Sequence, residues 1–282
     1  MSDAWHSLYL RVEDFPDTPT AAAALQDALS REGYQPYDPF AGGSGTPISL
    51  KTFVKCLVAP PQDGWIRILG EPGNPVKAMQ TAVVELSAGR PILWAWLSGK
   101  DEGGLTPYRD GQLSADGLGV YLRPDKTADD LARALGGTMP TVIEVSSGGM
   151  LPDDIQRLAQ KGNVDSNQAA KMMDRITSQL FGKLDRASGG EASTMQDQAR
   201  ALAMGGNRVD WNSPAGQRLR ALATVLMFPT NWREPDFGAV RDAYQAARML
   251  RKNPRAMLMP DEQAALKAIP NANDYEAVYV GK

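Results

Sequence analysis

Apolar and polar residues alternate in short runs through the first half of the chain, with helix-like segments between them. Runs of this kind predict strands over 7–12, 48–58, 65–70 and 92–98. Thr18-Pro19 and Asn74-Pro75 each place a capping residue and a proline at a helix start, and we expect these helices to end at Gly33 and Gly89. The predicted order β-α-β-β-α-β is that of a ferredoxin-like antiparallel sheet with both helices on one face.

A turn at Asp110-Gly111 predicts a further hairpin that continues through 119–123, before a helix near Thr127. Later elements are a strand over 141–145 and helices over 152–161, 167–184, 192–204, 214–227 and 237–252, of which the helix that begins at Ser213-Pro214 has the clearest start. Alternation returns over 275–280 and predicts a last strand that rejoins the first sheet. We therefore expect an α+β sandwich domain over 1–138 and a mostly α-helical domain over 139–282.

Composition is that of a globular protein, with 43% hydrophobic and 22% charged residues and a net charge of -3 over 282 residues. Residues 1–136 have 12 basic and 17 acidic side chains, whereas residues 200–255 have 10 basic and 4 acidic ones. The basic stretch would suit nucleic acid or an acidic partner, but docking on the acidic half explains it more simply. No apolar run has the length of a membrane span and no leader pattern opens the chain, so we predict a cytoplasmic protein that is not embedded in a membrane.

His6 is the only histidine of the chain and Cys56 the only cysteine. A single histidine disfavours histidine-based nucleophilic catalysis, and these two residues alone cannot form the usual zinc site within one chain. Cys56 shares the inward phase of its strand with Val54 and Val58, so we interpret it as a core residue. Phosphate-loop and dinucleotide-binding motifs are absent, and no cofactor or metal is predicted.

Side chains alternate across a strand, so each predicted strand divides into two faces. One face is aliphatic, with residues such as Leu8, Leu10, Ile66 and Ile68, and should lie under the two helices. The other mixes aromatic rings with cations, which is typical of a partner-binding or base-stacking surface. Its candidate binding residues are Tyr9, Arg11, Lys55, Trp65, Arg67, Trp94, Trp96 and Arg123.

The helical half can itself cover this aromatic–basic face, and the apolar stripe of the helix over 237–252 suits that role. We favour this arrangement over an open face for a protein partner, and nucleic acid is disfavoured because this half is acidic and lacks ribonucleoprotein signatures. The leading functional hypothesis is a non-enzymatic interaction or regulatory module that binds a protein or small ligand at this face or in the cleft between the halves. The alternatives are a hydrolase or transferase with carboxylate, tyrosine and arginine chemistry in that cleft, and a nucleic-acid-binding protein; the oligomeric state stays open.

Overall fold

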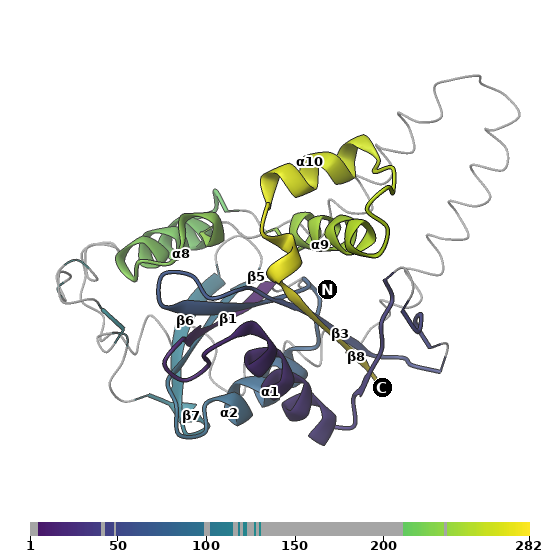
Figure 1. Cartoon of the computed structure of the whole chain (residues 1–282). Coiled ribbons are helices and arrows are strands. Elements are labelled where there is room, and N and C mark those ends of the chain that lie inside the picture. Colours follow the sequence, from purple (N-terminus) through teal and green to yellow (C-terminus); the bar gives the residue numbers. More distant parts are fainter. Residues whose placement is uncertain are drawn as a thin grey trace, which may run out of the picture.

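An eight-stranded antiparallel sheet lies between two layers of helices in the computed structural model of the chain (Figure 1). The structure describes residues 5–40, 43–47, 49–98, 102–114, 118, 121–122, 127, 130, 211–233 and 236–282. The strands are β1 (Trp5–Arg11), β2 (Gln35–Pro36), β3 (Phe53–Val58), β4 (Trp65–Gly70), β5 (Ile92–Ser98), β6 (Glu102–Arg109), β7 (Gln112–Leu113) and β8 (Glu276–Gly281). They pair in the order β2-β8-β3-β4-β1-β5-β6-β7, with antiparallel neighbours throughout.

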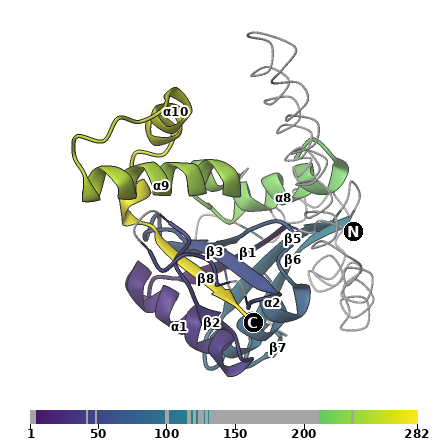
Figure 2. The same ribbon diagram turned by 90° about the vertical axis from the view of Figure 1, so that its right-hand side faces the viewer.

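The described residues form five α-helices, divided between the two faces of the sheet (Figures 1 and 2). Helices α1 (Thr18–Arg31) and α2 (Val76–Leu86) cover one face. Helices α8 (Pro214–Val225) and α9 (Phe237–Lys252) cover the other, and α10 (Pro260–Ala268) packs on α9. Short 3-10 turns occupy Thr230–Trp232 and Ala272–Asp274. None of the described helices combines the length and the apolar composition needed to cross a membrane.

Helix starts follow the capping rules, with two shifts from the prediction. Asp17, one residue before the predicted cap, accepts a hydrogen bond from the Thr20 amide at 2.8 Å and caps α1. Ser213 caps α8 as predicted, with its hydroxyl accepting from the Gly216 amide at 3.1 Å. Asn74 does not cap α2: its side chain bonds instead to the amide and carbonyl of Lys55 at 3.0 and 2.9 Å. The predicted cap of α2 is therefore wrong, because the side-chain amide of Asn74 is hydrogen-bonded to the backbone of β3.

The core beneath α1 and α2 is aliphatic, as the alternation in the strands predicts. Leu8, Cys56 and Ile68 are fully buried there, against Leu25 of α1 and Met79 of α2. Burial raises the pKa of the Cys56 thiol to about 12, so the thiol stays protonated at neutral pH. The interpretation of Cys56 as a core residue is confirmed.

The carboxyl-terminal segment is part of this sheet. Strand β8 pairs with β3 along six consecutive residues, from Phe53 opposite Gly281 to Val58 opposite Glu276. Tyr37 also donates its amide to the Tyr279 carbonyl at 3.0 Å, next to the short β2–β8 pairing. Strand β8 thus pairs with residues more than 200 positions earlier in the sequence. The strand predicted over 275–280 lies inside the sheet and not at its edge.

Elements with strong local signals match the structure closely. The strands predicted over 65–70 and 92–98 have the bounds of β4 and β5, and the helix predicted over 237–252 has those of α9. The strand predicted over 48–58 begins only at Phe53, and Tyr121 and Leu122 lie in no strand, so these two predictions are wrong in part. Helix α10 and strand β2 are missed. The predictions over 141–145, 152–161, 167–184 and 192–204, and Arg123, fall outside the described residues.

Candidate functional site

The aromatic–basic face predicted from the sequence is buried beneath the carboxyl-terminal helices at its centre. Tyr9, Trp65 and Arg67 lie on this face, and each is no more than 3% exposed. The Tyr9 ring stacks on that of Phe228, with centroids 3.9 Å apart, and the Arg67 guanidinium lies 5.0 Å from the Trp232 ring. Burial lowers the pKa of Arg67 while the Tyr275 and Tyr9 phenols oppose that shift. These three residues are therefore part of the packing between the sheet and the carboxyl-terminal layer.

Arg11 lies at the margin of the same face. Its guanidinium carbon stands 4.0 Å above the Trp65 ring, and Nη2 donates to the Tyr121 carbonyl at 3.1 Å. Burial lowers its pKa, and Glu13 acts in the opposite sense. Arg11 therefore covers Trp65, which accounts for its position without a bound partner.

Trp94 and Trp96 lie on the opposite face of the sheet from the one predicted. In the β1–β5 pairing Leu8 is opposite Trp94 and His6 is opposite Trp96, so both indoles share the side of the sheet that α1 and α2 cover. Strand β5 is buried on both faces, and an apolar run of this kind gives no polar position from which to choose the phase. The placement of these tryptophans on the aromatic–basic face is thus wrong.

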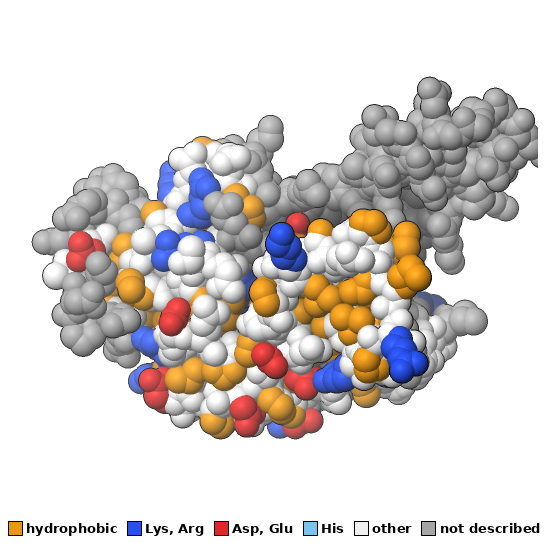
Figure 3. Space-filling view, turned by 45° about the horizontal axis from the view of Figure 1, so that its top comes forward, with side chains coloured by type: hydrophobic (Ala, Val, Ile, Leu, Met, Phe, Trp, Pro, Cys, Tyr) orange, Lys and Arg blue, Asp and Glu red, His pale blue; other side chains and the backbone are white. Residues whose placement is uncertain are grey.

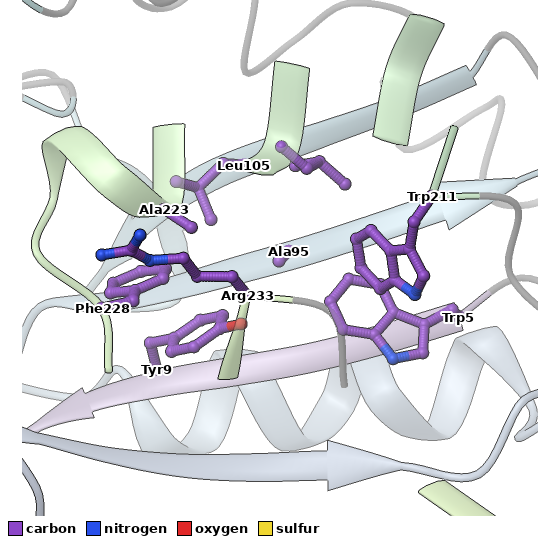
Figure 4. A pocket seen from close by; sticks show the side chains of 9 residues that line it. Trp5, Tyr9, Ala95, Leu105, Trp211, Ala223, Phe228 and Arg233 are labelled. Atoms are coloured by element: carbon purple, nitrogen blue, oxygen red, sulfur yellow. The ribbon is translucent and has the colours of Figure 1, made fainter. Parts of the chain in front are cut away.

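A small cavity remains between the sheet and α8 (Figure 4). Its volume is about 10 Å³, enough for one water molecule at most, and Tyr9, Phe228 and Arg233 line one end while Trp5 and Trp211 line the other. The Nε atom of Arg233 is buried there without a hydrogen-bond partner among the described atoms. This cavity is a packing defect of the interlayer core and is too small for an organic ligand.

A much larger hollow, of about 510 Å³, opens where β3 and β8 meet α9. We call it the β3–α9 groove. Its lining consists of Tyr37, Pro39, Phe40, Thr46, Phe53, Lys55, Glu71, Arg241, Asp242, Gln245 and Tyr279. Of the candidate residues that the structure describes, only Lys55 lines it. Figure 3 views the side of the molecule that carries the carboxyl-terminal helices, where hydrophobic surface is interspersed with basic and acidic side chains.

Aromatic rings form one continuous wall of the β3–α9 groove. Tyr37 meets Phe53 and Tyr279 edge to face, with centroids 5.5 and 5.9 Å apart. Phe40 meets Tyr279 in the same way at 5.1 Å, and Tyr244 of α9 supports Phe40 from behind at 5.1 Å. Edge-to-face contacts over these distances fix the orientation of each ring, so the wall is formed before any ligand arrives.

Two ion pairs provide the polar side of the β3–α9 groove. Lys55 Nζ lies 2.7 Å from Glu71 Oε2, and the Asn74 bonds to the Lys55 backbone fix the base of that side chain. On α9, Arg241 donates from Nε and Nη2 to the same Asp242 oxygen at 2.9 and 2.8 Å. A guanidinium has five N–H groups, so three of those on Arg241 have no partner among the described residues.

The Tyr279 hydroxyl belongs to a ring of the aromatic wall, on a residue directly opposite Lys55 in the β3–β8 pairing. It is buried and has no hydrogen-bond partner among the described atoms. Burial raises the pKa of Tyr279 strongly, Glu71 adds to the shift, and Arg241 opposes it. Burial and Glu71 likewise raise the pKa of Tyr37 to about 12. Both phenols therefore keep their protons at neutral pH, and the Tyr279 hydroxyl is a donor without an acceptor.

Sequence reasoning missed Tyr279 although it predicted the strand that carries it. Lys55 and Tyr279 are directly opposite in the β3–β8 pairing and so share one face of the sheet. The alternation over 275–280 indicates a strand, but only the register with β3 brings this tyrosine to Lys55. Phe40 and Arg241 reach the β3–α9 groove from a loop and from α9, and no local motif marks either.

The part of the chain that the structure describes brings no three His, Cys, Asp or Glu side chains together as a metal site would. Comparisons of the chain with protein-family models, with curated proteins and with solved structures return no match. The fold defines a mixed α+β protein with an eight-stranded antiparallel sheet, and its candidate site is the β3–α9 groove.

Proposed function

We propose that this chain is a non-enzymatic binding module for a small molecule and that the β3–α9 groove is its binding site. The observation that carries the proposal is the buried, unpartnered Tyr279 hydroxyl at the wall of an open groove of about 510 Å³. Pockets for small molecules typically measure about 300–1,000 Å³ and combine apolar walls with a few fixed polar groups. An uncompensated buried donor is costly, and a ligand acceptor would remove that cost.

The protonation chemistry of the β3–α9 groove favours binding over catalysis. General acid–base catalysis works best with a group that titrates near the operating pH. The phenols of Tyr37 and Tyr279 titrate far above neutrality, and Glu71 and Asp242 are each held by a cation. The proposed binding site is therefore in the cleft between the halves, and Lys55 is the residue of the aromatic–basic face that lines it.

We assign the four central strands and two helices to a ferredoxin-like arrangement, and the order β3-β4-β1-β5 with α1 and α2 on one face supports the assignment. In such a sandwich, the sheet face away from the two helices is where ligands bind in many proteins, but fold alone does not assign function. Here the carboxyl-terminal helices cover the centre of that face, and the β3–α9 groove remains at its side.

Filling the β3–α9 groove should abolish ligand binding. Gln245 lines the groove from α9, so a Gln245→Trp substitution places an indole in the space without removing a buried side chain. Three bicyclic probes cover the charge types: indole, naphthalene-1-acetate and naphthalen-1-ylmethylamine. We expect saturation-transfer-difference NMR to detect binding of at least one probe to the wild-type chain and no binding to Gln245→Trp.

The matched control is Gln263→Trp, which adds the same indole at an exposed position of α10 outside the groove. This variant should bind the probes as the wild-type chain does, and circular dichroism should give all three proteins the same melting curve. If no probe binds the wild-type chain, or if Gln245→Trp binds as strongly as Gln263→Trp, the groove is not the site and the proposal is wrong.

A further inference from the structure

From the free hydrogen-bonding groups of the β3–α9 groove we infer its ligand class: an aromatic or heteroaromatic molecule with an acidic group such as a carboxylate. The inference rests on the proposed function and adds the chemistry of the ligand to it. In this arrangement the ring lies against Phe40 and Phe53, and the acidic group accepts from Arg241 and Tyr279.

Two side chains that line the groove offer hydrogen-bond donors to a ligand. Arg241 has three N–H groups left after its two bonds to Asp242. The Tyr279 hydroxyl is buried and has no hydrogen-bond partner among the described atoms. Both side chains line the same groove, and Arg241 lowers the pKa of Tyr279. One acidic group between them would therefore accept from both, and charge-assisted bonds to a guanidinium are among the strongest hydrogen bonds in proteins.

A cationic ligand fits the same groups poorly. It would leave the Tyr279 proton and the spare Arg241 donors without acceptors, and it would bring a second positive charge to Arg241 and Lys55. The carboxylates that could attract it already hold cations, since Glu71 pairs with Lys55 and Asp242 with Arg241. The aromatic wall alone could bind a ring that carries either a positive or a negative group, so the donor groups of Arg241 and Tyr279 determine which charge of ligand is preferred.

The aromatic part of the ligand follows from the shape of the wall. Tyr37, Phe40, Phe53 and Tyr279 come from three separate parts of the chain and converge through nearly perpendicular ring contacts. A planar ring can extend this set at the usual centroid spacing of about 4.5–7 Å. A volume of about 510 Å³ has room for a bicyclic ring with a short acidic arm.

The test compares two probes that share a ring and differ in charge, naphthalene-1-acetate and naphthalen-1-ylmethylamine, by isothermal titration calorimetry. We expect the acetate to bind the wild-type chain about tenfold more tightly than the amine, and we expect Arg241→Gln to remove that preference. Arg251→Gln is the matched control, because Arg251 is an exposed arginine of the same helix outside the groove, and it should keep the preference.

Tyr279→Phe is a second variant that removes only the hydroxyl. Because that hydroxyl has no partner in the free protein, the substitution should leave the melting temperature unchanged or raise it. Acetate binding should weaken while amine binding stays the same. Equal acetate affinity in Arg241→Gln and Arg251→Gln, or tighter binding of the amine by the wild-type chain, would overturn the inference and leave the binding function in place. Failure of both probes and of indole to bind would overturn the two together.

Discussion

Replacing Trp94 and Trp96 together with alanine is expected to unfold the chain. Each indole is only 1% exposed, on the side of the sheet that α1 and α2 cover. Truncating a buried tryptophan to alanine costs about 3–5 kcal/mol, so the pair should cost about 6–10 kcal/mol. The whole free energy of unfolding of a domain is roughly 5–15 kcal/mol, so a loss of this size removes a large part of it or all of it.

Urea unfolding followed by circular dichroism measures this loss. Trp94→Phe is the matched control, because it keeps an aromatic ring in the same core position and should cost much less than alanine. If the double alanine variant keeps the wild-type unfolding midpoint, the two indoles are not core residues and the register of β5 against β1 is wrong. The same result would restore the binding face predicted from the sequence.

Acidification is expected to destabilise the protein through His6. This residue lies in β1, near the centre of the sheet, with no exposed surface and with both ring nitrogens unpartnered among the described atoms. Burial lowers its pKa from 6.5 to about 4. Between these two values the unfolded chain binds a proton that the folded chain does not, so stability falls as pH falls from 6.5 to about 4. The full shift corresponds to a loss of about 3 kcal/mol, and the loss becomes negligible about one pH unit above 6.5.

Other groups also titrate in this range, so the measurement compares wild type with His6→Leu. Leucine is an apolar side chain of similar volume that needs no hydrogen bonds and no proton. We expect the free energy of unfolding to fall by about 3 kcal/mol more in wild type than in His6→Leu between about pH 7.5 and about pH 4. At the higher pH the variant should be at least as stable, because the two unpartnered nitrogens are gone. Equal pH dependence in the two proteins would show that His6 is solvated or paired.

The limits of sequence reasoning appear most clearly at β5. The apolar run over 92–98 gave the bounds of the strand, because strand length and flanking residues are local signals. It could not give the phase, because a strand buried on both faces has no polar side, and the pairing with β1 settles which residues share a face. The predicted first strand begins at residue 7 and leaves His6 out, whereas β1 begins at Trp5, is paired on both sides and buries His6 fully.

The candidate site was predictable only in part, and for a related reason. Lys55 was identified from the cations that alternate along its strand, and a cleft between the halves was among the predicted locations. Tyr279 joins Lys55 through the β3–β8 register, across more than 200 residues of sequence, and Arg241 joins them through the packing of α9 on the sheet. Long-range contacts of this kind leave no periodic signal in the chain, so the groove becomes visible only in three dimensions.

The most direct test of the β3–α9 groove as the binding site is to locate a bound probe on the protein. A ¹H–¹⁵N chemical-shift titration with naphthalene-1-acetate should give its largest changes at the amides of Lys55, Gln245 and Tyr279, around the β3–α9 groove. The amides of Tyr9 and Trp65, beneath the carboxyl-terminal helices, should change little. Largest changes at Tyr9 and Trp65, or no changes at all, would contradict the assignment of the groove as the binding site.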